Sequence, residues 1–175
     1  MLRTGMDHAP IIVSALLGPE DFAWLDGLRR AHFPPARNQL DAHLTLFHHL
    51  PQSVEVELAG RLTDIARRPA PTASAGGVLN LGRGVAILIV SQDLERIRAE
   101  LASAFAGSLT PQDAARWRPH VTIQNKVQPT EARSLFDTLA HGFRPRDLRI
   151  VGLAAWWYRG GPWELLSAVR FEDCS

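Results

Sequence analysis

The sequence predicts an α+β fold made of two similar halves, each with its own antiparallel-type sheet. The chain has 175 residues, of which 46% are hydrophobic and 21% charged, as is usual for one globular domain and unlike disordered, collagen-like or coiled-coil chains. Short apolar runs alternate with amphipathic segments. The order strand, helix, strand, helix, strand occurs twice, the second time with one extra strand. That last pair of strands flanks Arg159-Gly160-Gly161-Pro162, which indicates a hairpin.

The first half begins with a buried strand. Residues 11–17 are apolar and rich in β-branched side chains, and Pro19-Glu20-Asp21 then opens a helix that ends near Phe33, before Pro34-Pro35. The remaining elements of this half are a strand at 43–49, a helix at 53–68 with Ser53 as its N-cap, a turn-rich connection at 69–77 and a strand at 78–81.

The second half repeats this order after Gly82-Arg83-Gly84. We expect a strand at 85–91, an amphipathic helix at 93–106, a strand at 120–126, a helix at 130–141, and strands at 148–158 and 163–171. Residues 10–175 should therefore form a single domain with lobes at about 10–81 and 82–175, and strand exchange between the lobes stays open. Residues 1–9 carry no periodic pattern and are expected to form a flexible leader.

Charge and cysteine content limit the ligands and the location. The formal net charge is +1, which argues against a long basic groove for nucleic acid and against a polybasic membrane patch. Cys174 is the only cysteine, so there is no internal disulfide, thiolate zinc site or iron–sulfur motif. The apolar run at 11–17 is too short to span a bilayer. We expect a cytoplasmic monomer without an obligate protein partner.

One short pattern occurs on corresponding strands of the two halves. Residues 43–46 read His-Leu-Thr-Leu and residues 120–123 read His-Val-Thr-Ile. Two such matches arise by chance with a probability of roughly 0.002. On a strand, residues i and i+2 point to the same face, so each motif directs one imidazole and one hydroxyl to the same side. Two such strands facing each other would form a four-residue cleft.

This combination of side chains suits displacement at phosphorus. An imidazole with an ordinary pKa near 6.5 can accept or donate a proton at neutral pH, so one histidine can act as base while the other acts as acid. An in-line displacement at phosphorus needs these two groups on opposite sides of one atom. The threonine hydroxyls can donate hydrogen bonds to the non-bridging phosphate oxygens.

The two motifs, with Arg118-Pro119 before the second, resemble those of the 2H phosphoesterase superfamily, and within it the bacterial 2'-5' RNA ligase-like proteins. The resemblance covers about residues 11–171 and implies a bilobal α+β fold with pseudo-twofold symmetry, outer helices and a metal-free central cleft. It implies an RNA 2',3'-cyclic phosphodiesterase that needs no cofactor and yields a 2'-phosphate, with weak 2'-5' ligation in reverse. By the same resemblance, His43 and His120 are the acid and base, and Thr45 and Thr122 bind phosphate.

The residues after the first motif depart from the family pattern. Phe47-His48-His49 stands where members have a small or aromatic residue and glycine, which leaves the acid–base pair intact and changes the rim of the cleft. Strand alternation puts Phe47 and His49 on the face of His43, and Gln124 and Lys126 on the face of His120, whereas His48 should pack or cap. Other candidate contacts are Arg118 and Arg83 for phosphate, and one of Trp156 and Trp157, which either stacks on a base or packs in the core.

Three functional hypotheses stay open on sequence grounds. The substrate is an RNA end or a small cyclic nucleotide, or it is a non-RNA cyclic phosphate such as one on ADP-ribose, or the cleft binds such ligands without turnover. A zinc site from His43, His48 and His49 is disfavoured by strand parity and by the lack of nearby acids or thiolates. The chain has no Gly-x-Ser-x-Gly elbow, Walker-type loop or Rossmann fingerprint.

Overall fold

The computed structural model describes residues 9–174. The strands are β1 (Ile11–Leu17), β2 (Leu44–Leu50), β3 (Thr72–Asn80), β4 (Val85–Val90), β5 (His120–Gln124), β6 (Arg146–Trp157) and β7 (Glu164–Arg170). The helices are α1 (Pro19–His32), α2 (Glu55–Ala66), α3 (Gln92–Ala104), α4 (Pro111–Ala114) and α5 (Pro129–Gly142). The predicted leader lies outside the described residues except for Ala9, which is buried.

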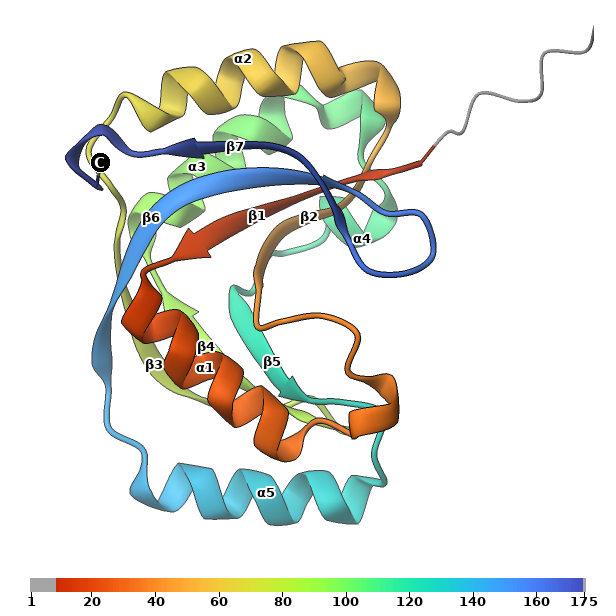
Figure 1. Ribbon diagram of the computed structural model, residues 1–175, viewed down its shortest axis with the longest axis vertical. Helices are drawn as coiled ribbons and strands as arrows, with labels where there is room; N and C mark the ends of the chain where they lie inside the picture. Colours follow the sequence, from red (N-terminus) through yellow and green to blue (C-terminus); the bar gives the residue numbers. More distant parts are fainter. Residues whose placement is uncertain (1–8, 175) are drawn as a thin grey trace, which may run out of the picture.

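Within the described range, seven antiparallel strands form one strongly curved sheet. Their order is β2-β1-β6-β3-β4-β5, with β7 paired to β6. The sheet curls so that β2 and β5, the two ends of this order, face each other across the open side of the molecule (Figure 1), and these two strands are in contact. Because each end strand carries one of the two sequence motifs, the curvature of the sheet brings the motifs together.

Strand β6 belongs to both lobes. Its beginning pairs with β3, whereas its later residues pair with β1 on one side and β7 on the other. One lobe therefore contains β1, β2, β7 and most of β6, and the other contains β3, β4, β5 and the start of β6. The pairing crosses the two consecutive segments 10–81 and 82–175, as the strand exchange left open by the sequence requires: β3 pairs with β4 and the start of β6, and the later part of β6 pairs with β1.

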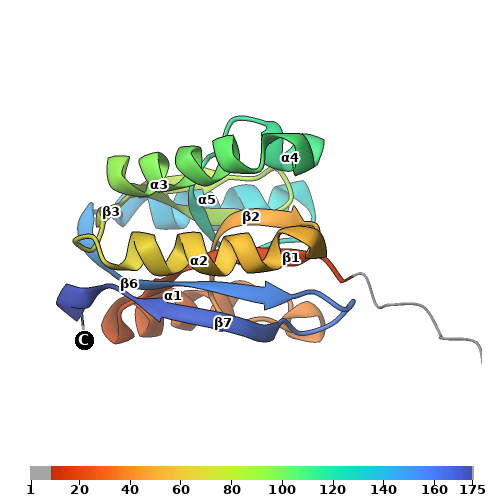
Figure 2. The same ribbon diagram turned by 90° about the horizontal axis from the view of Figure 1, so that it is seen from above.

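The helices cover the outside of the curved sheet. Figures 1 and 2 show α2 and α3 over the lobe of β1 and β2, and α5 at the opposite end. Helix α1 contacts β5, α2 contacts β6 and β7, and α5 contacts β3 and β4. Helix α1, from the first half of the chain, thus packs on the lobe that carries the motif strand of the second half. No described helix is long and apolar enough to cross a membrane.

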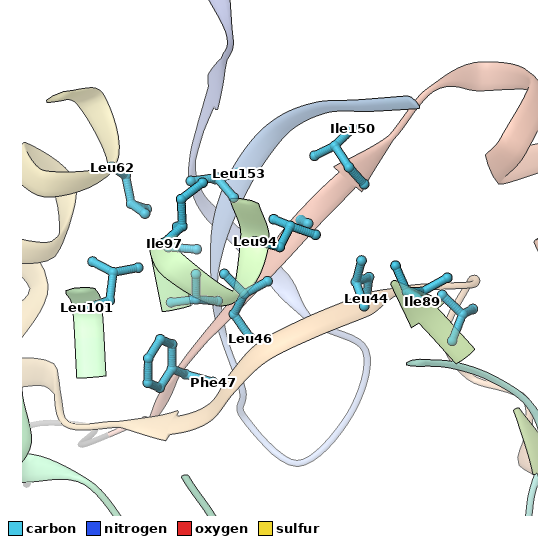
Figure 3. Close-up of a cluster of buried hydrophobic side chains, with 14 of the residues drawn as sticks. Leu44, Leu46, Phe47, Leu62, Ile89, Leu94, Ile97, Leu101, Ile150 and Leu153 are labelled. Atoms are coloured by element: carbon cyan, nitrogen blue, oxygen red, sulfur yellow. The ribbon is translucent and has the colours of Figure 1, made fainter. Parts of the chain in front are cut away.

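A continuous apolar core lies under α2 and α3. Leu44, Leu46 and Phe47 of β2 pack there with side chains from both helices, and Ile150 and Leu153 of β6 complete the cluster (Figure 3). Leu44 and Leu46 are fully buried. Because their side chains point into the core, the alternate side chains at 43 and 45 point to the concave side of the sheet.

Most predicted elements are present, with shifts of a few residues at their ends. Two local predictions are wrong. Ser53 lies in a short 3₁₀ turn, and α2 begins two residues later without a side-chain cap. The turn-rich stretch 69–77 holds most of β3, which starts at Thr72, because ladder hydrogen bonds to β4 and β6 keep its small and glycine residues extended. Weak strand propensity is overridden there by tertiary pairing.

Candidate active site

The two motifs line one cavity of about 340 Å³ between the facing strands. His43 directly precedes β2, and Thr45 lies in this strand; His120 and Thr122 lie in β5. All four side chains line the same cavity. The histidines and threonines are half-buried, while the apolar residues between them are fully buried and anchor each strand.

Both histidine rings are held in the same way. The Nδ1 atom of His43 lies 2.7 Å from the carbonyl oxygen of Asp41, and Nδ1 of His120 lies 2.6 Å from the carbonyl oxygen of Arg118. Since a carbonyl oxygen can only accept, each Nδ1 carries a proton and donates it. In its neutral form each ring therefore leaves Nε2 without a proton, available to accept one.

His43 is neutral at physiological pH. Burial lowers its pKa to about 4, and the positive charges of Arg29, His48 and His120 act in the same direction, against the opposing effect of the bond to the Asp41 carbonyl. The ring centroid of Trp163 lies 4.5 Å from that of His43, so an indole covers part of the imidazole. The uncharged imidazole is therefore the form ready to act as a base.

Besides the motifs, the cavity is lined by three arginines and by the buried carboxylate of Asp113. Arg98, Arg116 and Arg118 line it together with His48 and Trp117. The predicted contact Arg118 is thus placed beside His120 in the cavity. Arg83, the other arginine considered, does not line this cavity and donates instead from Nε to the carbonyl oxygen of Val127. The guanidinium groups that line the cavity are of a type that donates hydrogen bonds to phosphate oxygens.

A β-bulge after the first motif overturns the expected positions of the residues that follow it. Ser14 pairs with Thr45 and Val13 with Phe47, so Leu46 is an extra residue in β2. A bulge reverses the alternation of side chains beyond it. Phe47 is therefore fully buried and does not reach the cavity, whereas His48 lines it. His49 is exposed but does not line the cavity.

Asp113 holds the bulged segment. Its buried carboxylate accepts hydrogen bonds from the backbone N–H groups of His48 and His49, and lies 3.3 Å from Nδ1 of His48. Burial alone would raise the pKa of Asp113, but the bonds from His48 and His49 lower it below its usual value. The carboxylate satisfies donors that the bulge has removed from the strand ladder.

The second motif strand repeats this irregularity. Ala86 pairs with Thr122 and Val85 with Gln124, so Ile123 is an extra residue in β5. Gln124 is consequently 3% exposed, and it does not line the cavity as expected. Lys126 lies beyond the end of the strand with φ of 63°, and lines a different cavity with Arg37 and Tyr158.

Two residues that the sequence analysis missed connect each motif to the other half of the chain. The buried Arg29 of α1 donates from Nη1 to the carbonyl oxygen of Thr122 and from Nε to that of Leu40. Trp117 donates from Nε1 to the carbonyl oxygen of Thr45. Each motif is thus braced by a side chain from the opposite half. The sequence contained one signal for this bracing role: Arg29 is a charged residue on the buried face of a helix.

No metal centre is apparent among residues 9–174. The described side chains contain no group of three or more His, Cys, Asp or Glu residues arranged to hold a metal ion. His43 and His48, two of the histidines weighed for zinc, each use Nδ1 in a hydrogen bond to a protein oxygen.

Solved structures define the class of fold. TT0787 of Thermus thermophilus is similar with a TM-score of 0.62 and 15% identity, covering 93% of this chain and 97% of that one. E. coli LigT complexed with 3'-AMP is similar with a TM-score of 0.59 and 20% identity, covering 94% and 99%. LigT complexed with NADP+ gives 0.59 and 18%, covering 95% and 99%. The chain shares its bilobal, duplicated fold with these structures.

A sequence comparison gives the family. Residues 17–162 match the model of the 2'-5' RNA ligase superfamily. No curated protein matches the chain in sequence. Because the matched segment spans most of the chain and both motifs, the protein belongs to the 2'-5' RNA ligase superfamily. The resemblance to 2H phosphoesterases predicted from the motifs is confirmed, and membership implies an enzyme of the phosphoesterase or ligase type.

Proposed function

We propose that the protein hydrolyses 2',3'-cyclic phosphates, on RNA ends or nucleotides, to 2'-phosphomonoesters by acid–base catalysis without a metal ion. One observation carries this proposal: two His-x-Thr motifs line a single cavity, and each histidine keeps Nε2 free because its Nδ1 donates to a backbone carbonyl. An in-line displacement at phosphorus needs one group that accepts a proton and one that donates a proton. Two imidazoles with free Nε2 atoms can fill these two roles.

The lowered pKa of His43 assigns it the role of base. Nε2 of His43 takes a proton from a water molecule, and the water oxygen forms a bond to phosphorus. The bond from phosphorus to the ribose 3' oxygen breaks, and Nε2 of His120 delivers a proton to that oxygen. The products are the 2'-phosphomonoester, a protonated His43 and a neutral His120, and exchange with solvent restores both rings.

The threonines and arginines bind the phosphate. The hydroxyls of Thr45 and Thr122 donate hydrogen bonds to the non-bridging oxygens, which gain charge in the transition state. Arg98, Arg116 and Arg118 supply the positive potential of the cavity. With an RNA 5'-hydroxyl in place of water, the same two histidines would open the cyclic phosphate to a 2'-5' linkage and leave a free 3'-hydroxyl, so weak 2'-5' ligation belongs to the proposal.

The solved relatives support a nucleotide ligand. Structures of E. coli LigT are described as complexes with 3'-AMP, NADP+, ATP and phosphate. These complexes concern LigT, whose identity to this chain is 18–20%. They favour a ligand of the same chemical class in the cavity described above.

The test is turnover in the presence of excess chelator. The substrates are a nucleoside 2',3'-cyclic phosphate and an oligoribonucleotide with a cyclic end, and the product is identified by phosphorus NMR. We expect a 2'-phosphate from at least one of them, at an undiminished rate with EDTA. Loss of activity with chelator would contradict the metal-free mechanism.

The other outcomes separate the remaining hypotheses. If neither RNA substrate turns over, a panel that includes a cyclic phosphate on ADP-ribose tests the non-RNA alternative. Binding by calorimetry without turnover of any of them would replace the proposed enzyme by a binding module.

A further inference from the structure

A cavity of about 350 Å³, here called the distal cavity, lies outside the site described above. An apolar cavity adjoins both of them: it shares His43 with the motif cavity, and Gln39 and Leu40 with the distal one. Trp156 and Trp163 line this apolar connection. A ligand held by the two motifs can therefore extend past His43 and reach the distal cavity.

Three cationic side chains from separate segments line the distal cavity. Arg29 belongs to α1, Arg37 to the short 3₁₀ turn before β2, and Lys126 follows β5. Figure 1 shows this turn and the end of β5 on the open side of the molecule. The phenol of Tyr158 contributes to the same wall, and no described Asp or Glu does. The lining of the distal cavity thus contains positive charge without a carboxylate to balance it.

The buried Arg29 carries a charge that no described carboxylate contacts. Its side chain is 4% exposed, and all its hydrogen bonds to described residues go to neutral oxygens, among them the carbonyl oxygens of Leu40 and Thr122. Burial lowers its pKa, and the charges of Asp26 and Asp41 oppose this effect without forming an ion pair with it. A buried charge is costly unless it is paired, so an anion in the distal cavity would supply the missing partner.

The other two cations are available to a ligand. Arg37 and Lys126 are exposed, and neither forms an ion pair with a described carboxylate. The backbone of Lys126 has φ of 63°, a left-handed conformation that costs free energy in any residue other than glycine. Its N–H donates to Oδ1 of Asn125, which holds this conformation. Backbone strain of this kind is concentrated at positions that clamp ligands.

We infer that the distal cavity binds a second phosphate group of the substrate, the one on the 5' side of its terminal nucleoside. The inference rests on the proposed function, because a 2',3'-cyclic phosphate closes the 3' end of a strand and leaves a further backbone phosphate only on the 5' side. Arg37 and Lys126 donate to the phosphate oxygens, and the hydroxyl of Tyr158 is a further donor. The group is either the diester of an RNA strand or the 5'-phosphate of a mononucleotide.

Three substrates that differ on the 5' side test this inference. They are adenosine 2',3'-cyclic phosphate, the same nucleotide with a 5'-phosphate, and the dinucleotide ApA with a 2',3'-cyclic end. We expect wild type to have a higher kcat/KM for the substrates with a second phosphate. A preference for the dinucleotide identifies the RNA diester as the ligand, and a preference for the 5'-phosphate alone identifies the mononucleotide.

The variant Arg37→Gln/Lys126→Gln should reduce this preference about 5-fold or more, because two exposed charge pairs are lost. The informative quantity is the ratio of kcat/KM with and without the second phosphate, so any effect on the shared chemistry divides out. The matched control is Arg67→Gln/Arg96→Gln, which removes two exposed charges from α3 and the end of α2, outside the lining of the distal cavity. This control should keep the preference of wild type.

Calorimetry gives a readout that needs no turnover. The ligands are adenosine 2'-monophosphate, adenosine 2',5'-bisphosphate and ApA with a 2'-phosphate end. We expect wild type to bind a ligand with the second phosphate more tightly, and the double variant Arg37→Gln/Lys126→Gln to lose this advantage. If no substrate turns over but this difference is seen, the proposed function fails and the distal phosphate site stands. No preference in wild type by either method, or a preference that the double variant keeps, would overturn the inference.

Discussion

The two motif histidines are matched in geometry and differ in environment. Each donates from Nδ1 to the carbonyl oxygen two residues earlier in the chain, Asp41 for His43 and Arg118 for His120. His43 is additionally covered by Trp163, and its pKa is lowered to about 4. The same backbone motif thus presents two equivalent nitrogens, and the surroundings determine that His43 stays neutral.

The lowered pKa of His43 predicts a pH-dependent stability. An unfolded histidine titrates near pH 6.5, so between this value and about pH 4 the unfolded state binds more protons than the native state. Stability therefore falls as the pH is lowered through this window. Relative to His43→Gln, wild type should lose about 1–2 kcal/mol of unfolding free energy between pH 7 and pH 5, measured by urea denaturation. Parallel curves for the two proteins would contradict the assignment.

The threonine hydroxyls should contribute to rate without setting the pH profile. Thr45→Val and Thr122→Val each remove one hydrogen bond to a non-bridging oxygen, and each should lower kcat about 10²- to 10³-fold. The bell-shaped profile, whose limbs report the coupled histidine pair, should keep its shape. Steady-state kinetics against pH check this, with the exposed Thr63 of helix α2 changed to Val as control. A tenfold loss or less in both variants would remove the threonines from phosphate binding.

At the scale of single residues, the sequence correctly predicted that the four motif side chains face one cavity. It misplaced the side chains that follow each motif. Spacing within a motif depends only on strand alternation, which holds between His43 and Thr45. The extension to Phe47 and Gln124 failed in both strands for one reason, the bulge that follows each motif at Leu46 and Ile123. Neither position carries a glycine or another local sign of a bulge.

Helix α1 couples the two motif strands through its buried polar face. Asp26 accepts from the N–H of Ala42, next to His43, and Arg29 bonds the carbonyl oxygens of Leu40 and Thr122. The helix belongs in sequence to the first motif and contacts the strand of the second. These hydrogen bonds from α1 to the backbone therefore tie the loop before His43 to the strand that carries His120.

Removal of Arg29 should affect stability and catalysis together. Arg29→Gln loses charged hydrogen bonds to backbone oxygens, and should reduce the free energy of unfolding by roughly 2–3 kcal/mol. It should also lower kcat, because β5 loses its connection to the loop before His43. Arg96→Gln on helix α3 is the control, since Arg96 is 72% exposed and pairs with Asp93 on its own helix at the surface. Equal effects of the two variants, in denaturation and in kinetics, would refute this role.

The elements themselves were predictable where a local signal existed. Pro19 and the acidic residues after it marked the start of α1, whereas Ser91, which caps α3 by accepting from Leu94, was expected at the end of the preceding strand. β3 was not predicted over its full length, because it consists largely of small residues. The pairing of β6 with both lobes is a long-range property that local periodicity does not contain.

At the scale of the whole molecule, the near-balanced charge predicts weak salt dependence. The net charge is +1. The arginines near the two motifs, Arg98, Arg116 and Arg118, line a single cavity. Contact with one or two phosphates of a single strand gives a slope of log affinity against log salt of roughly −1 to −2. Fluorescence anisotropy of a labelled oligoribonucleotide with a 2'-phosphate end measures this slope. A slope steeper than about −5 would indicate an extended basic track.

The central claim is that His43 and His120, from the two end strands of one curved sheet, act on the same phosphate. It is tested most directly by kcat/KM of wild type, His43→Ala, His120→Ala and the double variant with a nucleoside 2',3'-cyclic phosphate. Each single change should lower the rate about 10²- to 10⁴-fold, and the double change should cost less than the product of the two. Near-normal activity in either single variant, or fully multiplicative losses, would contradict the account.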